Sequence, residues 1–228
     1  MRGEPETERG VEADEGGVAA GESGREGAET TRTRRRARTR EAILAVGRTL
    51  LLEKGVDGFT LREVARAADY SPSALYRHFR NKDELVAAVA MEGLRVLGGF
   101  LMEIPENAHT DQRLLGLGQA YLRFAHESPE YFSLVFNRLS LPATNWEHLV
   151  QVAWPFTLVV EAFVRGVREG RFRETEGQTA DVMALGFWSL AHGAATLRAG
   201  QLRGVSDDLG PFFTVALRTY LDGLEARP

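Results

Sequence analysis

The sequence contains no cysteine. Disulfide bonds, thiolate metal sites and thiol-based redox sensing are therefore excluded for this chain. Long apolar runs are also missing: the longest, residues 149–160, spans twelve positions and contains a glutamine and a proline. A membrane-spanning helix needs roughly twenty apolar residues. We therefore expect a soluble protein that works in the cytoplasm and does not enter a membrane.

Sequence motifs typical of catalysis are absent as well. The histidines are scattered without an i, i+4 pair, so no metal site is expected. No nucleophile elbow, glycine-rich phosphate loop or carboxylate cluster accompanies the acidic residues. We predict that the chain is not an enzyme and carries no cofactor. A helical small-molecule-binding protein or an enzyme is the alternative from another functional class.

The first thirty residues have no aromatic side chain and are rich in glycine and glutamate. They carry nine acidic residues against three arginines, a net charge of −6. They also lack the basic start and apolar run of a secretory signal. So few apolar groups cannot offset the entropy cost of ordering a chain, so residues 1–30 are predicted to be a disordered acidic tail.

Positive charge is concentrated directly after this tail. Residues 31–80 carry twelve Lys and Arg against five acidic residues, a net of +7, although the whole chain has a net charge of −4. A basic block beside an acidic remainder favours a polyanionic partner for the basic block alone. For the run at 31–40, a solvated arginine-rich linker is the alternative.

Helical periodicity dominates the chain and no convincing alternating strand appears, which predicts an all-α fold. After the basic run, a first helix ends before Gly55. The segment 60–68 opens with Thr60 as N-cap and Glu63 as its capping-box partner. A third, short helix starts at Ser71 and Pro72, a favoured cap and first-turn pair. Two short helices joined by a tight turn behind a supporting helix make a helix-turn-helix unit.

The third helix is short and carries many groups that could contact nucleic acid. A helix of this unit must lie in the major groove, which is about 12 Å wide. Its spacing places Leu75 and Phe79 in the core, whereas one exposed face can meet base edges. That face comprises Pro72, Ser73, Ala74 and Arg77. Tyr76, His78 and Lys82 flank the groove and can reach phosphates, although Tyr76 and His78 could also be purely structural.

The next helix is predicted to begin at Asn81, with Glu84 completing a second capping box. Longer helices follow at about 81–102, 110–126, 129–138, 144–169, 177–200 and 206–225. The region 31–85 is therefore expected to be the DNA-binding domain, and 86–228 a larger helical domain.

At residues 39–85 the chain resembles the N-terminal domain of TetR-family transcriptional regulators. The resemblance is carried by Thr-Leu-Arg at the start of the second helix, Leu-Tyr-x-His-Phe in the third and Lys-x-x-Leu after it. It implies base-edge contacts from Arg62 and the face already named, and backbone contacts from Thr60, Tyr76, His78 and Lys82. The family's usual turn contains a glycine in a left-handed conformation, where this chain has Asp69. Asp tolerates that conformation better than most residues.

The stretch from Trp188 to His192 and Gly193 resembles a Trp…His-Gly signature of one C-terminal variety of the family. The resemblance implies a helical domain for effector binding and dimerisation, with the last two helices forming the dimer's four-helix interface. An apolar or amphipathic effector is expected between helices 110–126, 144–169 and 177–200. Its predicted pocket residues are Phe100, Tyr121, Phe124, Trp154, Phe163, Phe187, Trp188 and His192. For His192, a hydrogen-bonded core position is the alternative.

The helix at 177–200 carries large apolar residues on one face and small residues on another. A helix that is apolar on nearly every side must be covered on nearly every side, and a second copy of the chain is one cover. A helix wrapped by its own bundle is the alternative. The predicted dimer interface is Gly186, Ser189, Gly193, Phe212, Phe213, Leu217 and Tyr220. We expect a homodimeric, ligand-responsive repressor of a palindromic operator in double-stranded DNA, with an activator or a ligand-independent regulator as the alternative.

Overall fold

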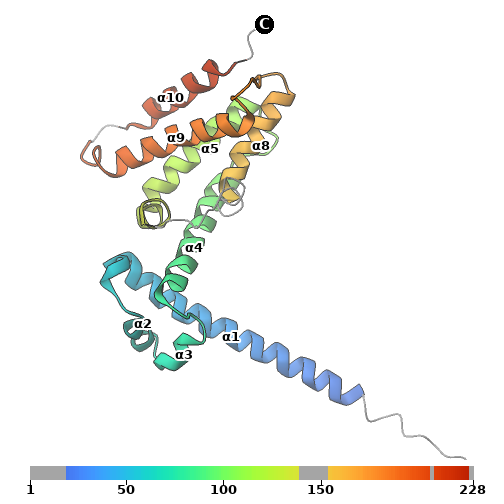
Figure 1. Ribbon diagram of the computed structural model, residues 1–228, viewed down its shortest axis with the longest axis vertical. Helices are drawn as coiled ribbons and strands as arrows, with labels where there is room; N and C mark the ends of the chain where they lie inside the picture. Colours follow the sequence, from blue (N-terminus) through green and yellow to red (C-terminus); the bar gives the residue numbers. More distant parts are fainter. Residues whose placement is uncertain (1–18, 139–153, 206–207, 226–228) are drawn as a thin grey trace, which may run out of the picture.

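The computed structural model describes residues 19–138, 154–205 and 208–225. These residues form helices and no named strand, which confirms the all-α prediction. Two helical groups are joined by one long helix, α4 (Figure 1). The elements are α1 (Ala19–Lys54), η1 (Val56–Gly58), α2 (Leu61–Ala67), α3 (Pro72–Tyr76), α4 (Lys82–Met102), α5 (Thr110–Glu127), α6 (Pro129–Ser133), η2 (Leu134–Arg138), α8 (Trp154–Arg168), α9 (Ala180–Ala199) and α10 (Gly210–Gly223).

The N-terminal group packs α2 and α3 against the second half of α1 and the first half of α4. Its core contains Val64, Leu75, Phe79 and Leu85, none of which has exposed surface. Burying a side chain of this size contributes about 1.5–3 kcal/mol. The short helix α3 is therefore held by its buried residues, because five residues are too few for a stable isolated helix.

Local signals at the start of α2 and α3 behave as predicted. The Thr60 hydroxyl accepts from the Glu63 N–H, and the Glu63 carboxylate accepts from the Thr60 N–H at 2.7 Å, a complete capping box. The Ser71 hydroxyl accepts from the Ala74 N–H at 3.2 Å. Between the two helices, Asp69 has φ 59°, the one positive value at a non-glycine among the described residues. The left-handed turn expected at Asp69 is confirmed.

The predicted second capping box is only half formed. The Asn81 side chain accepts from the Glu84 N–H at 2.8 Å and caps α4 as expected. The Glu84 carboxylate does not return the bond to Asn81; it accepts from the backbone N–H of Arg80 at 2.9 Å and from the Arg80 guanidinium at 3.3 Å. Arg80 thus occupies, with its backbone N–H and its guanidinium, the carboxylate that a complete capping box would offer to the Asn81 N–H.

The helix α4 contributes to both hydrophobic cores. Leu85, Val89 and Leu94 lie in the N-terminal core, and Leu97 and Leu101 lie in the C-terminal one. Its length and apolar content would also suit a membrane span, but 56% of that window is buried inside the protein. This degree of burial is what a core helix shared by two domains requires. Any movement of α4 therefore changes the packing of both cores.

The C-terminal group surrounds α5, which packs against α4, α8, α9 and α10. The segment after α5 differs from the single helix predicted at 129–138: α6 ends at Ser133 and continues as a π-helical turn, η2. Leu134 and Val135 of this turn belong to the N-terminal core, whereas Phe132 belongs to the C-terminal core. This short segment therefore contacts both cores and joins the two helical groups.

A partly buried ion pair ties α1 to α4 at the junction of the domains. The Arg48 guanidinium lies 3.0 Å from the Glu92 carboxylate, and Glu92 is 8% exposed. The Tyr131 side chain of α6 lies near both groups, and burial together with the Glu92 charge raises its pKa. Gly93 gives Tyr131 room, because a Cβ there would lie 3.0 Å from the Tyr131 ring. Three helices thus meet at one polar contact.

Other element boundaries also differ from the sequence prediction. The first helix begins at Ala19, well inside the predicted tail 1–30; the remainder of that tail, 1–18, lies outside the described residues. Residues 19–30 contain three alanines and three glutamates, which are strong helix formers, and three glycines, which are not. Adding residues to an existing helix costs less than starting one. The segments 144–153 and 206–207, predicted as helix starts, also lie outside the described residues.

Candidate nucleic-acid interface and apolar cavity

The helix α3 presents an exposed polar face on a rigid support. Leu75 and Phe79 are fully buried, so their burial fixes which way the rest of α3 faces. On the opposite side, Pro72, Ser73 and Arg77 are exposed. The structure therefore places Pro72, Ser73 and Arg77 together on one accessible face of α3.

The predicted nucleic-acid contacts differ in how freely they can reach a ligand. Those with exposed side chains are Thr60, Arg62, Pro72, Ser73, Tyr76 and Arg77, and those that are half-buried are Ala74, His78 and Lys82. The Ser73 hydroxyl is hydrogen-bonded to the Ser71 hydroxyl at 3.0 Å, so it is already oriented. Tyr76 is 46% exposed, which favours a contact role over a purely structural one.

Lys82 makes contacts that the sequence did not predict. Its ammonium donates to the Phe59 carbonyl at 2.7 Å and lies 4.5 Å from the centroid of the Phe59 ring. These two contacts tie the first turn of α4 to the loop before α2. In this state Lys82 has a structural role, and the predicted phosphate contact would have to use its remaining donors. In the sequence, the only indication of these contacts was an aromatic residue, Phe59, 23 positions before Lys82.

Positive charge surrounds the end of α3. Burial, and then the charges of Arg36, Arg77 and Arg40, hold the pKa of His78 below its usual value. The Arg40 guanidinium lies 4.8 Å over the centroid of the Phe79 ring. Two arginines of α1, from the basic block predicted to favour a polyanionic partner, thus join the α3 surface. A surface of this sign and shape suits a polyanion with regularly spaced phosphates.

Residues 43–89 match the family of bacterial regulatory proteins called the tetR family, and residues 114–220 match a tetracycline repressor-like C-terminal domain. The chain belongs to the TetR family. It is a DNA-binding transcriptional regulator of the helix-turn-helix type.

Individual relatives agree with this assignment. This TetR-family chain is 25% identical over 186 residues to the uncharacterised HTH-type transcriptional regulator YobS of Bacillus subtilis (strain 168), covering 82% of this chain and 92% of that protein. It is 29% identical over 82 residues to the HTH-type transcriptional repressor KstR2 of Mycolicibacterium smegmatis, covering 36% of this chain and 40% of that protein. A solved protein of unknown function from Rhodococcus sp. RHA1 superposes with a TM-score of 0.67 at 29% identity, covering 83% of this chain and 96% of the other.

The helical domain of this TetR-family chain contains a small apolar cavity of about 110 Å³ between α4, α5, η2, α8 and α9. The cavity adjoins the three helices from which a pocket was expected. Of the predicted pocket residues, Tyr121, Phe187 and Trp188 line it. Phe124 and Phe163 are instead fully buried core residues outside its wall. An aromatic residue contributes to a cavity wall only if packing leaves one of its faces uncovered, which sequence periodicity does not encode.

The remaining predicted pocket residues, Phe100, Trp154 and His192, do not line the cavity either. Phe100 packs edge-to-face on Phe124, with ring centroids 6.0 Å apart. The Trp154 ring lies against α4 at Gly98, where any Cβ would collide with it. His192 stacks on Trp188, with ring centroids 5.1 Å apart and planes inclined by 25°. Its Nδ1 is hydrogen-bonded to the Tyr121 hydroxyl at 2.9 Å, and burial lowers the pKa of His192.

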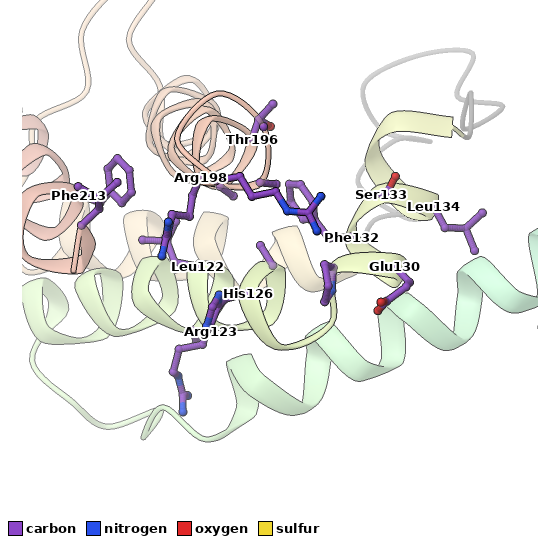
Figure 2. Close-up of a pocket in the computed structure, with 18 of the residues that line it drawn as sticks. Leu122, Arg123, His126, Glu130, Phe132, Ser133, Leu134, Thr196, Arg198 and Phe213 are labelled. Atoms are coloured by element: carbon purple, nitrogen blue, oxygen red, sulfur yellow. The ribbon is translucent and has the colours of Figure 1, made fainter. Parts of the chain in front are cut away.

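A second, larger hollow of about 1780 Å³ lies between the end of α1, α5, α6, α9 and α10. Figure 2 shows polar side chains such as Arg123, His126 and Arg198 on its sides. Arg123 already pairs with Glu103 at 2.6 Å, and Arg198 donates to two carbonyls of its own loop. The volume exceeds the roughly 300–1,000 Å³ of closed ligand sites, so this is an open inter-domain surface.

The predicted interface residues divide into two groups. Ser189 is exposed, Gly193 has nothing within 4 Å of a built Cβ, and Phe212 is 67% exposed, so these lie on the outer surface. Phe213 is half-buried beside the large hollow. Leu217, in contrast, is 2% exposed and packs inside the protomer.

Two further predicted interface residues contact each other within one protomer. The Tyr220 ring lies against Gly186, where a Cβ would collide with its hydroxyl, and that hydroxyl donates to the Met183 carbonyl at 2.9 Å. Leu217, Gly186 and Tyr220 therefore make contacts within the protomer: α10 packs one side against α9, and the other side of the pair is left for a partner. The regular apolar stripe predicted for α10 lies on this inner side.

Proposed function

We propose that this TetR-family chain is a homodimeric repressor that binds a palindromic DNA operator and releases it when an apolar molecule enters the α5–α9 cavity. The observation that carries the proposal is the exposed face of α3, held in place by the burial of Leu75 and Phe79. The partial likeness to a repressor favours repression over activation.

Sequence preference is the first property to test. Duplexes bound from a random pool should converge on a palindrome with half-sites about 34 Å apart, because the two recognition helices of a dimer enter successive major grooves. Protein carrying Ser73→Ala and Arg77→Ala should keep its helical content and enrich nothing. A pool that stays random with the wild-type protein would favour the alternative of a helical small-molecule-binding protein or enzyme.

The outer face of α9 and α10 supports a homodimer. It exposes Val182, Leu190 and Leu197 from α9, and Phe212 and Val215 from α10. A contiguous apolar face of this kind marks an interaction surface, and a twofold dimer is the commonest way to cover it. The small residues Ser189 and Gly193 lie within this face and allow close approach of a second helix.

A matched pair of substitutions tests this interface. Phe212 and Met102 are similarly exposed, 67% and 72%, but only Phe212 lies on the α9–α10 face. Phe212→Asp should convert the dimer to a monomer in sedimentation and abolish binding to the palindrome, whereas Met102→Asp should change neither. If both variants remain dimeric, another surface carries the dimer.

The cavity supports an apolar effector. Its lining side chains are hydrocarbon or aromatic, and the Tyr121 hydroxyl and the Trp188 indole are its polar groups. An engineered cavity of about 150 Å³ lined by apolar residues binds benzene, so a hollow of this size can hold one small apolar group. Larger molecules would have to move the walls, including Leu94, Leu97 and Leu101 of α4.

Movement of α4 is the proposed link to DNA. Since α4 begins directly after α3, displacing its cavity side changes the separation of the two recognition helices and their fit to both half-sites. The effector can shift this equilibrium only by its difference in affinity for the two states. A thermal-shift panel of apolar compounds tests entry, with Ala191→Leu, which fills the cavity, as the control that should lose the shift. A reporter gene measured with and without protein and compound separates this repressor from an activator or a ligand-independent regulator.

A further inference from the structure

The face of α1 that packs into the N-terminal core continues onto its arginine-rich extension. Ile43, Gly47 and Leu51 are buried at steps of four residues. Toward the N-terminus, steps of three and four lead from Ile43 to arginines. With 3.6 residues per turn, these positions share one side of the helix. The stripe is Arg32, Arg36, Arg40, Ile43, Gly47 and Leu51.

Contacts at the end of α3 place the nearer arginines of this stripe next to the recognition helix. Arg40 lies over the Phe79 ring, and the charges of Arg36 and Arg40 both act on His78. Arg36 and Arg32 are exposed, and residues 31–40 contain no acidic side chain. Figure 1 shows α1 passing α3 and continuing as a helix away from both domains.

We propose that Arg32 and Arg36 form a helical phosphate-binding rail that follows the DNA backbone outside the major-groove half-site read by α3. This inference rests on the proposed operator binding. Guanidinium groups suit the role because they remain charged and bind phosphate oxygens in two-pronged contacts. A helix holds them at a fixed spacing and on the same side as α3, which a flexible arm would not.

The geometry sets how far the rail reaches. Arg32 and Arg40 are eight residues apart, so about 12 Å of helix axis separates them. One strand of duplex DNA advances about 3.4 Å per base pair, so this length spans about three to four base pairs. The protected region should therefore extend by about that much beyond each half-site. Sequence preference should not change, since backbone contacts carry no direct base information.

The chain supplies its own matched control. Arg34 and Arg38 have the same spacing as Arg32 and Arg36, are equally exposed and lie in the same helix, but they lie on its opposite side. R32A/R36A and R34A/R38A thus remove the same charge and change helix propensity equally. Neither pair touches the buried core of α1.

The experiment measures affinity for the selected palindromic duplex at several salt concentrations, with flanks of full length and with flanks trimmed by four base pairs. Each lost phosphate contact lowers the slope of log affinity against log salt by about 0.9, so R32A/R36A should lower it by about four for a dimer. Between 50 and 200 mM salt it should lose about a hundredfold less affinity than the wild type. Trimming should weaken the wild type and R34A/R38A but leave R32A/R36A unchanged.

Each other outcome overturns a specific step. Equal slopes for R32A/R36A and R34A/R38A would mean that the extension acts as an unoriented cationic segment, and the rail would be wrong. A different selected sequence with R32A/R36A would mean that these arginines read bases instead of the backbone. If the wild type selects no sequence from the random pool, the proposed function fails and the rail fails with it. If the wild type selects a palindrome but R32A/R36A and R34A/R38A do not differ as predicted, the proposed function is retained and the rail is rejected.

Discussion

The ion pair between Arg48 and Glu92 at the junction of α1 and α4 should contribute more to stability than the exposed pair of Arg123 and Glu103, because its carboxylate is largely buried. The Glu92 side chain is 10% exposed and the Arg48 side chain is 34% exposed. Removing one partner of a buried pair leaves an uncompensated charge, which costs about 3–5 kcal/mol when burial is complete. The two single substitutions should differ here, because the two charges differ in their access to water.

Arg48→Met leaves the more buried charge unpaired, and we expect a loss of about 2–4 kcal/mol in the free energy of unfolding. Glu92→Leu leaves Arg48, which can turn toward water, and should cost about 1 kcal/mol. The double variant should lose less than the sum, since apolar replacements of both partners are often nearly neutral. For a chain of this length each kcal/mol corresponds to about 2–4 °C in Tm.

The assay is a double-mutant cycle measured by urea denaturation and far-UV circular dichroism. The exposed pair of Arg123 and Glu103 is the control: its atoms approach to 2.6 Å, but the side chains are 47% and 58% exposed. Its coupling energy should lie below about 1 kcal/mol. If both cycles give the same coupling, or if the Arg48 and Glu92 substitutions add without coupling, burial does not set the strength of the junction.

Three further outcomes follow from the described contacts. Arg77→Ala should relax discrimination at one base pair by about 1–3 kcal/mol. Lys82→Ala should lower both Tm and overall DNA affinity, because Lys82 donates a hydrogen bond to the Phe59 carbonyl in the free protein. If both variants weakened binding to operator and to random DNA equally, Arg77 would not be a base-reading residue. Burial and nearby arginines lower the folded-state pKa of His78. The contribution of His78 to the free energy of unfolding should therefore be lost as pH falls through the unfolded pKa of about 6.5, and DNA affinity should rise over the same pH range. His78→Gln should remove both pH dependences. Asp69→Gly should raise stability by up to about 1 kcal/mol and Asp69→Val lower it, since φ is 59° at this position; unfolding curves with the opposite order would exclude backbone strain there.

The helix-turn-helix unit could be predicted almost entirely from sequence. Its signals are local: the Thr60 and Glu63 capping box joins residues three apart, and Leu75 and Phe79 share a face because they are four apart. The left-handed turn at Asp69 was expected from the resemblance, because the family's usual turn has a glycine there. Such signals act within one helical turn, so the sequence by itself determined the helices, their caps and which face of α3 is exposed.

Only tertiary packing decided the contacts between residues far apart in the chain. Lys82 donates a hydrogen bond to the carbonyl of Phe59, 23 positions away, and Tyr121 is hydrogen-bonded to His192, 71 positions away. The apolar stripe of α10 could face a partner or its own protomer with the same periodicity, and packing on α5 and α9 buried Leu217 and partly covered Tyr220. The cavity exists for the same reason: its volume is what remains after several helices meet, and no one helix encodes it.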